Sequence, residues 1–340
     1  MKAILLEGKG GPEVLKLKEV PEPKPGKGEV CVKLDYAGVN YAEILSRKGL
    51  YGWKPKGAYT PGMEGSGVIE AVGEGVSPTL IGQRVMVGAK FGCYAEKVVV
   101  PAHLAIPALK QFSQQENAAF LVNYMTAWVA LFEMAKVQPG ETMLITAAAG
   151  GVGSAAVQLC VKWGCTVIGL AGSDEKLALV KKLGAAHAVN YRDADYHQKI
   201  EQLTGGVDVI LEMVGGDIYK KNLKLIRFFG RIVVAGFASF NLKKWNPFSW
   251  YKTWKDLPRI DIATMSHKSI GIFAFHLGYL LKDTERTMQC FERLREFVTK
   301  HDIHPIVGKI FPLEQAAEAH RFIESRKSTG KVLLKMNGAE

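Results

Sequence analysis

A glycine-rich turn between an apolar strand and a helical stretch is the feature that most constrains how this chain can fold. Residues 143–147 are apolar or β-branched, and residues 154–160 beyond the glycines have a helical composition. A dinucleotide pyrophosphate requires this order, because glycines let the backbone approach the phosphates and the helix start offers free N–H groups to negative charge. The fingerprint G-x-G-x-x-G is incomplete, since Ala148 stands at its first glycine position. We expect the pyrophosphate to contact Gly150, Gly151, Val152 and Gly153.

The residues after the next two predicted strands favour NADPH over NADH. In an NAD site, the strand that follows the glycine-rich turn and its helix ends in Asp or Glu, about 20 residues past the glycines, and the carboxylate binds the ribose hydroxyls. Here the strand 166–171 is followed by Ser173 and Lys176, and the strand 186–190 is followed by Tyr191. A small polar side chain and a cation suit a 2′-phosphate, and one charge-assisted hydrogen bond of about 1.5–3 kcal/mol would favour NADPH about tenfold or more. The alternative is that Lys176 is a solvated helix charge.

The pattern changes from short strands to alternating strands and helices near residue 123. Before this point, turn residues separate short strands, which predicts a β-rich, barrel-like domain. Beyond it, the alternation predicts a Rossmann doubly wound parallel sheet. A last strand at 331–335 should rejoin the first domain. We therefore expect a substrate domain of residues 1–122 and 280–340, a dinucleotide-binding domain of residues 123–279, and an active site in the cleft between them. The strands expected in the second domain are 143–147, 166–171, 186–190, 207–213, 230–235 and, at the edge, 269–275.

Composition and charge narrow the class of protein. No run of 18 uncharged apolar residues occurs in the 340-residue chain, so a transmembrane helix is not expected. The net charge of +11 would suit nucleic acid or an anionic membrane, but no helix-turn-helix, zinc-finger or RNP-type pattern accompanies it, and we expect no nucleic-acid partner. The five cysteines are scattered and form no Cys-x-x-Cys pair, which suits reduced core thiols in a cytoplasmic protein.

This order of parts resembles the medium-chain dehydrogenase/reductase superfamily over essentially the full length of the chain, and its zinc-independent quinone oxidoreductase branch in particular. The resemblance implies that the β-rich domain is GroES-like. Motifs that carry the broad match lie at residues 38–43, 61–68, 147–153 and 208–216. Shorter motifs resemble the subgroup of synaptic-vesicle membrane protein homologues, and these lie at residues 122–127, 275–280 and 330–334.

Zinc distinguishes the branches of this superfamily. A catalytic zinc needs three Cys, His or acidic ligands and an open position. Where alcohol-dehydrogenase relatives carry ligands, this chain has Asn40, Met63 and Val122, and it also lacks the four closely spaced cysteines of the structural zinc lobe. We therefore expect no metal site. Without a Lewis acid to stabilise an alkoxide, reduction of an activated acceptor, a quinone or an α,β-unsaturated carbonyl, becomes the expected reaction.

The resemblance also implies roles for single residues. Asn40 and Tyr41 should line the substrate cleft near the nicotinamide, although Asn40 could be a turn residue and Tyr41 could serve packing. Asn123 and Thr126 are expected to open a helix beside the nicotinamide-side phosphate, with a simple helix cap as the alternative for Asn123. Val214 and Gly215 follow one predicted strand, and Gly236 and Phe237 follow the next; their backbone groups should meet the nicotinamide ribose. Arg326, near the C-terminus, should help to hold the 2′-phosphate, unless it is an ordinary surface arginine.

Residues 240–260 interleave tryptophans with lysines, a pattern that suits a membrane interface or, as the favoured alternative, a lid or dimer element. The edge strand at 269–275 should pair with its twin in a homodimer. The leading hypothesis is a zinc-independent, NADPH-dependent oxidoreductase that transfers hydride to a quinone or enone. The other is a low-turnover NADPH-binding adaptor or peripheral membrane protein. The natural substrate, the proton donor and the number of electrons per step do not follow from the sequence.

Overall fold

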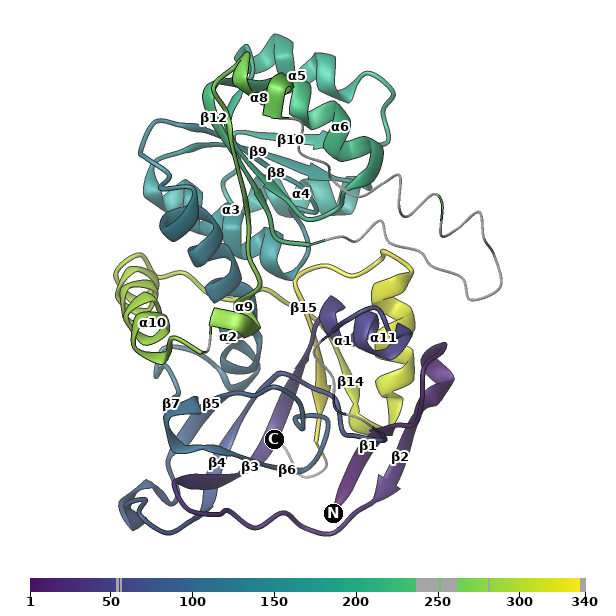
Figure 1. The fold of residues 1–340 in the computed structure, drawn as a ribbon, viewed down its shortest axis with the longest axis vertical. Coiled ribbons are helices and arrows are strands. Elements are labelled where there is room, and N and C mark those ends of the chain that lie inside the picture. Colours follow the sequence, from purple (N-terminus) through teal and green to yellow (C-terminus); the bar gives the residue numbers. More distant parts are fainter. Residues whose placement is uncertain (53–54, 56, 237–250, 252–261, 281, 337–340) are drawn as a thin grey trace. The chain divides into compact units, whose positions relative to one another are not determined.

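The computed structural model describes residues 1–52, 55, 57–236, 251, 262–280 and 282–336 (Figure 1). The chain forms two compact units. The first contains Met1–Asn123 and His304–Glu340, and the second contains Tyr124–Ile303. Among the described residues, no helix combines the length and the apolar composition that crossing a bilayer requires.

The first unit is built on a seven-stranded sheet with the order β14-β15-β3-β4-β5-β7, in which β6 also pairs with β3. The C-terminal strand β15 pairs antiparallel with β3, and Leu333 lies opposite Gly38, so the prediction that the end of the chain rejoins the N-terminal region is confirmed. This sheet confirms the β-rich domain that the sequence analysis predicted. The strands of the unit are β1 Lys2–Leu6, β2 Leu15–Glu19, β3 Glu29–Val39, β4 Glu64–Val72, β5 Arg84–Gly88, β6 Lys97–Pro101, β7 Ala105–Pro107, β14 Val307–Pro312 and β15 Lys331–Lys335.

The second unit contains a six-stranded sheet with the order β10-β9-β8-β11-β12-β13, and every strand pair in it is parallel. The strand order reverses between β8 and β11, as in a Rossmann doubly wound fold. Strand β8 is buried along its whole length, as expected for a parallel sheet covered on both faces. The strands are β8 Thr142–Ile145, β9 Thr166–Ala171, β10 His187–Asn190, β11 Val207–Glu212, β12 Ile226–Val234 and β13 Gly271–Ala274.

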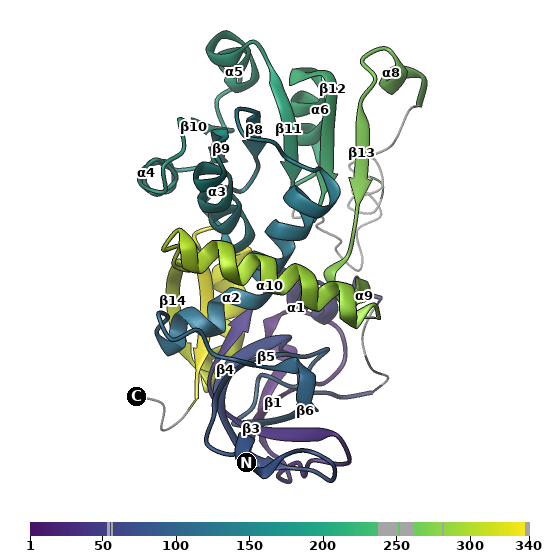
Figure 2. The same ribbon diagram turned by 90° about the vertical axis from the view of Figure 1, so that its left-hand side faces the viewer.

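The helices of the second unit follow its strands in alternation, and Figure 2 shows α3 to α6 gathered around the sheet. A π-helical turn at Val129–Met134 precedes β8. The helices are α3 Gly151–Trp163, α4 Asp174–Lys182, α5 Tyr196–Thr204, α6 Gly216–Leu225, α8 Ile262–Ser266, α9 Leu277–Leu280 and α10 Thr284–Lys300.

Helix α2, Gln114–Trp128, begins earlier than the sequence analysis expected. Asn123 and Thr126 therefore lie inside a helix, and the prediction that they open one is wrong. The start is set upstream by a capping box, in which the Ser113 N–H donates to Glu116 Oε2 at 2.7 Å and the Glu116 N–H donates to Ser113 Oγ at 3.2 Å. Two helices of the first unit, α1 Tyr41–Lys48 and α11 Ala316–Glu324, complete the elements that matter for the site.

Two of the sequence predictions fall on parts of the chain that the structure does not describe. Phe237 is one of them. The tryptophan-rich stretch 240–260 is the other, apart from Tyr251. The proposed lid or membrane contact of this stretch therefore stays a prediction.

Candidate active site

The turn between β8 and α3 has the geometry of a phosphate-binding turn. Gly150 is the N-cap of α3 and makes no side-chain cap bond, and the first turn of the helix carries no acidic residue. A Cβ atom at Gly153 would lie 2.2 Å from the carbonyl oxygen of Ala147, so only glycine allows the helix to pack this closely on the turn. The N–H groups of Gly151, Val152 and Gly153 lie in the first helical turn, where no carbonyl within the helix can accept them. These residues fit an anionic pyrophosphate.

The alanine at the first fingerprint position is accommodated by the neighbouring strand. Ala148 is fully buried, and its N–H donates to the carbonyl of Leu170 on β9 at 2.9 Å. A Cβ atom added to Gly169 on β9 would lie 2.9 Å from the Cβ of Ala148. The space that a glycine normally provides within the turn is therefore provided here by Gly169, across the strand pair.

Three of the residues predicted to read the 2′-phosphate, Ser173, Lys176 and Tyr191, follow the neighbouring parallel strands β9 and β10. Ser173 is the N-cap of α4 and is exposed, and its side chain makes no cap hydrogen bond. The Tyr191 N–H donates to the carbonyl of Ala171 at 3.1 Å, and the Tyr191 hydroxyl oxygen would lie 2.8 Å from a Cβ added to Gly172. Lys176 lies in the first turn of α4, together with two acidic residues, Asp174 and Glu175.

A buried carboxylate holds the loop after β11. Glu212 is fully buried, and its Oε1 accepts the N–H groups of Val214 at 2.7 Å and Gly215 at 2.8 Å. Burial raises the pKa of Glu212, and these hydrogen bonds oppose the rise. Gly215 has φ of 83°, in the left-handed region that favours glycine. Sequence reasoning named Val214 and Gly215 but missed Glu212, whose signal was an acidic residue at the end of an apolar strand.

Two further contacts define this edge of the sheet. The Thr146 hydroxyl accepts the N–H of Met213 at 2.8 Å, which ties the end of β8 to the loop after β11. A Cβ atom at Gly236, which follows β12, would lie 3.4 Å from the carbonyl oxygen of Met213. The loops after these three strands are therefore in contact, as the carboxyl edge of a doubly wound sheet requires.

In the first unit, a lysine ammonium is buried among polar side chains. Lys331 on β15 is 2% exposed, and its Nζ forms an ion pair with Glu64, which is 1% exposed. The Nζ also donates to Asn40 Oδ1 at 2.6 Å and to Asn123 Oδ1 at 3.4 Å. Glu64 Oε2 in turn accepts the N–H of Val122 at 2.9 Å. The cluster joins β15, β4, α1 and α2 within one unit.

Asn40 links this cluster to a second buried carboxylate. Its Nδ2 group donates to Glu43 Oε1 at 3.2 Å and to Glu64 Oε1 at 3.1 Å, while its backbone N–H donates to Glu43 Oε2 at 2.6 Å in a capping box of α1. Burial raises the pKa of Glu43 to about 7, although Lys331 and the bonds from Asn40 oppose the rise. All the polar groups of the Asn40 amide are thus engaged by neighbouring side chains, so Asn40 positions other residues.

Tyr41 follows Asn40 and is only partly exposed. Burial raises the pKa of its hydroxyl, Glu324 adds to the rise, and Arg326 opposes it. Arg326 therefore lies within electrostatic range of Tyr41, in the same unit. Arg326 also has φ of 58°, a left-handed conformation that is uncommon for arginine.

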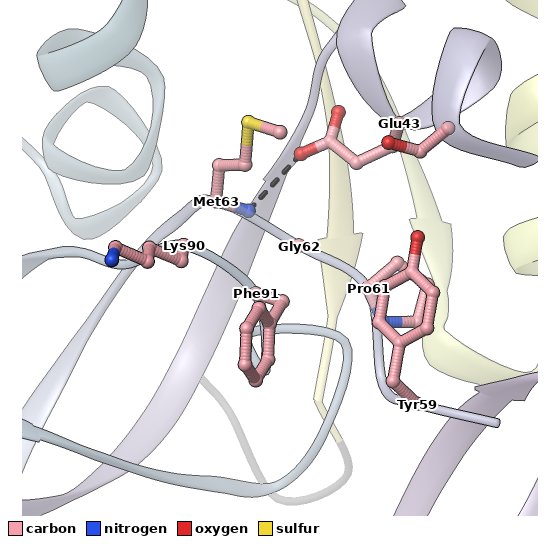
Figure 3. Close-up of a pocket in the computed structure, with 8 residues that line it drawn as sticks. Glu43, Tyr59, Pro61, Gly62, Met63, Lys90 and Phe91 are labelled. Carbon is pink, nitrogen blue, oxygen red and sulfur yellow. Dashed lines mark hydrogen bonds between the residues drawn. The ribbon is translucent and has the colours of Figure 1, made fainter. Parts of the chain in front are cut away.

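Glu43 reaches a small pocket of about 10 Å³, room for roughly one water molecule. In Figure 3 the carboxyl group of Glu43 points toward Met63, whose N–H donates to Glu43 Oε1 at 3.0 Å. The rings of Tyr59 and Phe91 lie edge to face with centroids 6.0 Å apart. Sequence reasoning missed most of this lining, which consists of Glu43, Ser46, Tyr59, Pro61, Gly62, Met63, Lys90 and Phe91.

The positions that carry zinc ligands in alcohol-dehydrogenase relatives have other roles here. Asn40 binds Lys331 and two carboxylates, while Met63 and Val122 each donate a backbone N–H to a carboxylate. Among the residues that the structure describes, no group of three or more His, Cys, Asp or Glu side chains could hold a metal ion.

Comparisons with known proteins match both domains of the chain and find relatives over nearly its full length. Residues 26–110 match the family model of the alcohol dehydrogenase GroES-like domain, and residues 151–290 match that of the zinc-binding dehydrogenases. The chain is 36% identical to the human synaptic vesicle membrane protein VAT-1 homolog, over 98% of this chain and 86% of the human protein. It is also 36% identical to rat quinone oxidoreductase, over 98% of this chain and 97% of the rat protein. The quinone oxidoreductase from Thermus thermophilus, solved also in complex with NADPH, has a TM-score of 0.82 and 31% identity, covering 98% of this chain and 100% of that one.

Proposed function

Because the chain belongs to the medium-chain dehydrogenase/reductase superfamily, among the VAT-1 homologues and quinone oxidoreductases, it is an oxidoreductase of this type, and we propose that it uses NADPH to reduce a quinone or an α,β-unsaturated carbonyl. The relatives named for quinone reduction and the NADPH complex of the Thermus thermophilus enzyme support the substrate class and the cofactor.

The end of β9 carries the preference for NADPH. The strand ends at Ala171 and is followed by Gly172 and Ser173, so no carboxylate stands where an NAD site holds the ribose hydroxyls. The exposed Ser173 side chain, which makes no cap bond, and the cation Lys176 in the first turn of α4 would hold the 2′-phosphate. We also propose that Arg326 contributes to this phosphate site.

When bound, NADPH supplies the hydride. The residues of this chain bind and orient. Gly150 to Gly153 would hold the pyrophosphate. Val214 and Gly215, which follow β11, and Gly236, which follows β12, would contact the nicotinamide ribose, together with Phe237. Asn123 and Thr126 would meet the nicotinamide-side phosphate from within α2.

Tyr41 is the residue proposed to contact the acceptor. A tyrosine hydroxyl is protonated at neutral pH and burial raises its pKa further, so Tyr41 can donate a hydrogen bond to the acceptor oxygen as negative charge develops there. Asn40 is proposed to act through its neighbours, since its amide groups are bonded to Glu43, Glu64 and Lys331. Tyr41 is thus proposed to polarise the acceptor, and the buried cluster around Asn40 and Lys331 is proposed to keep the site rigid.

The test is NADPH binding, followed by fluorescence titration, together with stopped-flow NADPH oxidation on a panel of quinones and enones. Oxidation that depends on the acceptor supports the proposal. Tight binding with no turnover on any acceptor would refute it and favour a low-turnover NADPH-binding adaptor.

A charge substitution tests the cofactor preference separately. The Ser173→Asp variant places a carboxylate beside the 2′-phosphate and should reduce the preference for NADPH over NADH at least about tenfold. The Ser77→Asp variant is the matched control, because Ser77 is the N-cap of the short helix Pro78–Leu80 in the other unit. An unchanged preference in Ser173→Asp would show that the 2′-phosphate binds elsewhere.

We also propose that the protein forms a homodimer through the edge strand β13. This strand ends the six-stranded sheet, and apolar side chains nearby are exposed: Phe228 by 67%, Phe229 by 76% and Ile262 by 78%. A hollow of about 270 Å³ lies beside them, lined by Ile262, Met265, Ser266, Ser269, Ile270 and Ile272. Sedimentation velocity should find two copies for the wild type and one for Phe229→Glu, while Leu203→Glu, 51% exposed on α5, should stay dimeric. A monomeric wild type would refute the dimer.

A further inference from the structure

Two of the free cysteines meet at the C-terminus of α3. Gly164 follows the helix with φ of 92°, its N–H donates to the carbonyl of Val161 at 3.1 Å, and the N–H of Cys165 donates to the carbonyl of Cys160 at 3.0 Å. These two bonds define a Schellman motif, in which the residue after the left-handed glycine contacts the residue five positions earlier. In most helices that contact is between apolar side chains. Here it is between two thiols.

The backbone geometry suits a covalent bond between them. A hydrogen bond of 3.0 Å from the N–H of Cys165 to the carbonyl of Cys160 places the two Cα atoms within the separation of about 4.4–6.8 Å that disulfides span. The two thiols interact with each other, since each shifts the pKa of the other, while Cys165 Sγ donates a hydrogen bond to the carbonyl of Gln138 at 3.6 Å. Both residues lie in the second unit and are reduced in the structure.

The two cysteines differ in exposure and acidity. Cys165 is partly exposed, whereas Cys160 is fully buried. The interaction between the two thiols lowers the pKa of Cys165, and together with burial it raises the pKa of Cys160. A partly exposed thiol of lowered pKa beside a second, resolving thiol is the arrangement of a cysteine that reacts with peroxide. The remaining cysteines, Cys31, Cys93 and Cys290, are all buried, and burial raises the pKa of each.

We propose that Cys160 and Cys165 form a reversible intrachain disulfide when the protein meets a hydroperoxide. The Cys165 thiolate attacks the peroxide, the O–O bond breaks, and Cys165 becomes a sulfenic acid while the peroxide leaves as hydroxide or alkoxide. The Cys160 sulfur then displaces the hydroxyl group of that sulfenic acid, which forms the S–S bond and releases water. A dithiol reductant restores both thiols.

The site is separate from the proposed pyrophosphate turn. Helix α3 has 13 residues, so its two ends lie roughly 20 Å apart. The disulfide would therefore protect Cys165 from irreversible oxidation without blocking the phosphate-binding end of the helix.

The sequence makes the test direct, because Lys162 lies between the two cysteines. The reduced full-length protein is treated with hydrogen peroxide, quenched, alkylated and digested with trypsin without reduction. Cleavage after Lys162 separates the cysteines into two peptides, which stay joined only if the disulfide has formed. The expected result is a linked peptide pair that a dithiol reductant separates, and an intact protein lighter by two hydrogen atoms.

Single variants identify the attacking and resolving thiols. Cys165→Ser should slow peroxide-driven thiol loss at least tenfold, whereas Cys160→Ala should accumulate a sulfenic acid at position 165 that dimedone traps. Cys290→Ser, which removes a buried thiol from α10 of the same unit, is the matched control and should behave like the wild type. Melting curves by circular dichroism establish whether each variant is folded. If a variant is not folded, the linked peptide pair from the wild-type protein alone decides the proposal. Sulfinic acid at Cys165 without a linked pair in the wild type, or no oxidation at all, would overturn it.

Discussion

Replacing Lys331 with methionine should destabilise the first unit strongly, because it removes the counterion of a buried carboxylate. Methionine keeps most of the apolar stem and deletes the charge. Glu64, only 1% exposed, would lose its ion pair, and Asn40 and Asn123 would lose the donor that their Oδ1 atoms accept. Removing one partner of a buried ion pair costs about 3–5 kcal/mol.

The remaining bonds place the expected cost at the lower end of that range. Glu64 would still accept the N–H of Val122 at 2.9 Å and the Nδ2 group of Asn40 at 3.1 Å. We therefore expect Lys331→Met to lose about 3 kcal/mol of unfolding free energy, a large fraction of the 5–15 kcal/mol typical of a protein. The double variant Lys331→Met/Glu64→Gln should lose at least about 1 kcal/mol less than the sum of the two single variants, since it leaves no unpaired charge.

The assay must report on the correct unit. Of the six tryptophans, only Trp53 precedes residue 124, so tryptophan fluorescence mainly follows the second unit. Native-state hydrogen exchange in increasing urea, read on peptides that cover β3 and β15, measures the opening of the first unit directly. Lys335→Met on the same strand β15 is the control and should change stability by no more than about 0.5 kcal/mol. A loss below about 1 kcal/mol in Lys331→Met, or strictly additive single variants, would refute the coupling.

Two further predictions follow from the same site geometry. Because burial raises the pKa of Glu43 from 4.5 to about 7, the folded state keeps a proton that the unfolded state releases, so the contribution of this group to stability is complete below pH 4.5 and about 3 kcal/mol of it is lost between pH 4.5 and 7. Glu43→Gln should remove that slope from thermal melts recorded between pH 5 and 8, and a wild-type slope in the variant would contradict it. Gly153→Ala should abolish NADPH binding in fluorescence titration and lower the melting temperature, because its Cβ would lie 2.2 Å from the Ala147 carbonyl oxygen. Gly88→Ala, whose Cβ would come no closer than 4.0 Å to a neighbour, is its control, and normal NADPH binding by Gly153→Ala would show that the turn can widen.

Local sequence patterns were sufficient for most of the sheets. The strand predicted at 166–171 agrees with β9, Thr166–Ala171, and the one predicted at 331–335 agrees with β15, because each is a short apolar run next to turn residues. The start of α2 was missed although its signal is local. Ser113 and Glu116 form a capping box three residues apart, but the alanine-rich helix that follows is buried and shows little amphipathic periodicity.

The buried cluster could not have been predicted from the sequence. Lys331 and Glu64 are 267 positions apart, and each reads locally as an ordinary charge at the end of a strand. Only the antiparallel pairing of β15 with β3, and of β3 with β4, brings them together. The thiol pair is the opposite case. Cys160 and Cys165 lie on either side of Gly164 at the spacing of a Schellman contact. They were not predicted to pair, because their spacing is not that of a Cys-x-x-Cys motif.

The incomplete glycine fingerprint shows how a motif should be interpreted physically. What a dinucleotide turn requires is space between the first strand, its neighbour and the helix, and a glycine in the turn is one way to provide it. In this chain the side chain of Ala148 in the turn occupies that space, and Gly169 on β9 has no side chain that would compete for it. A Cβ atom at Gly169 would lie 2.9 Å from Ala148 and 2.4 Å from Val180. Gly153 has no such partner, because the atom opposite its missing Cβ is the backbone carbonyl of Ala147, which a substitution elsewhere cannot remove. The first fingerprint position can therefore change when a facing side chain shrinks, whereas the last cannot.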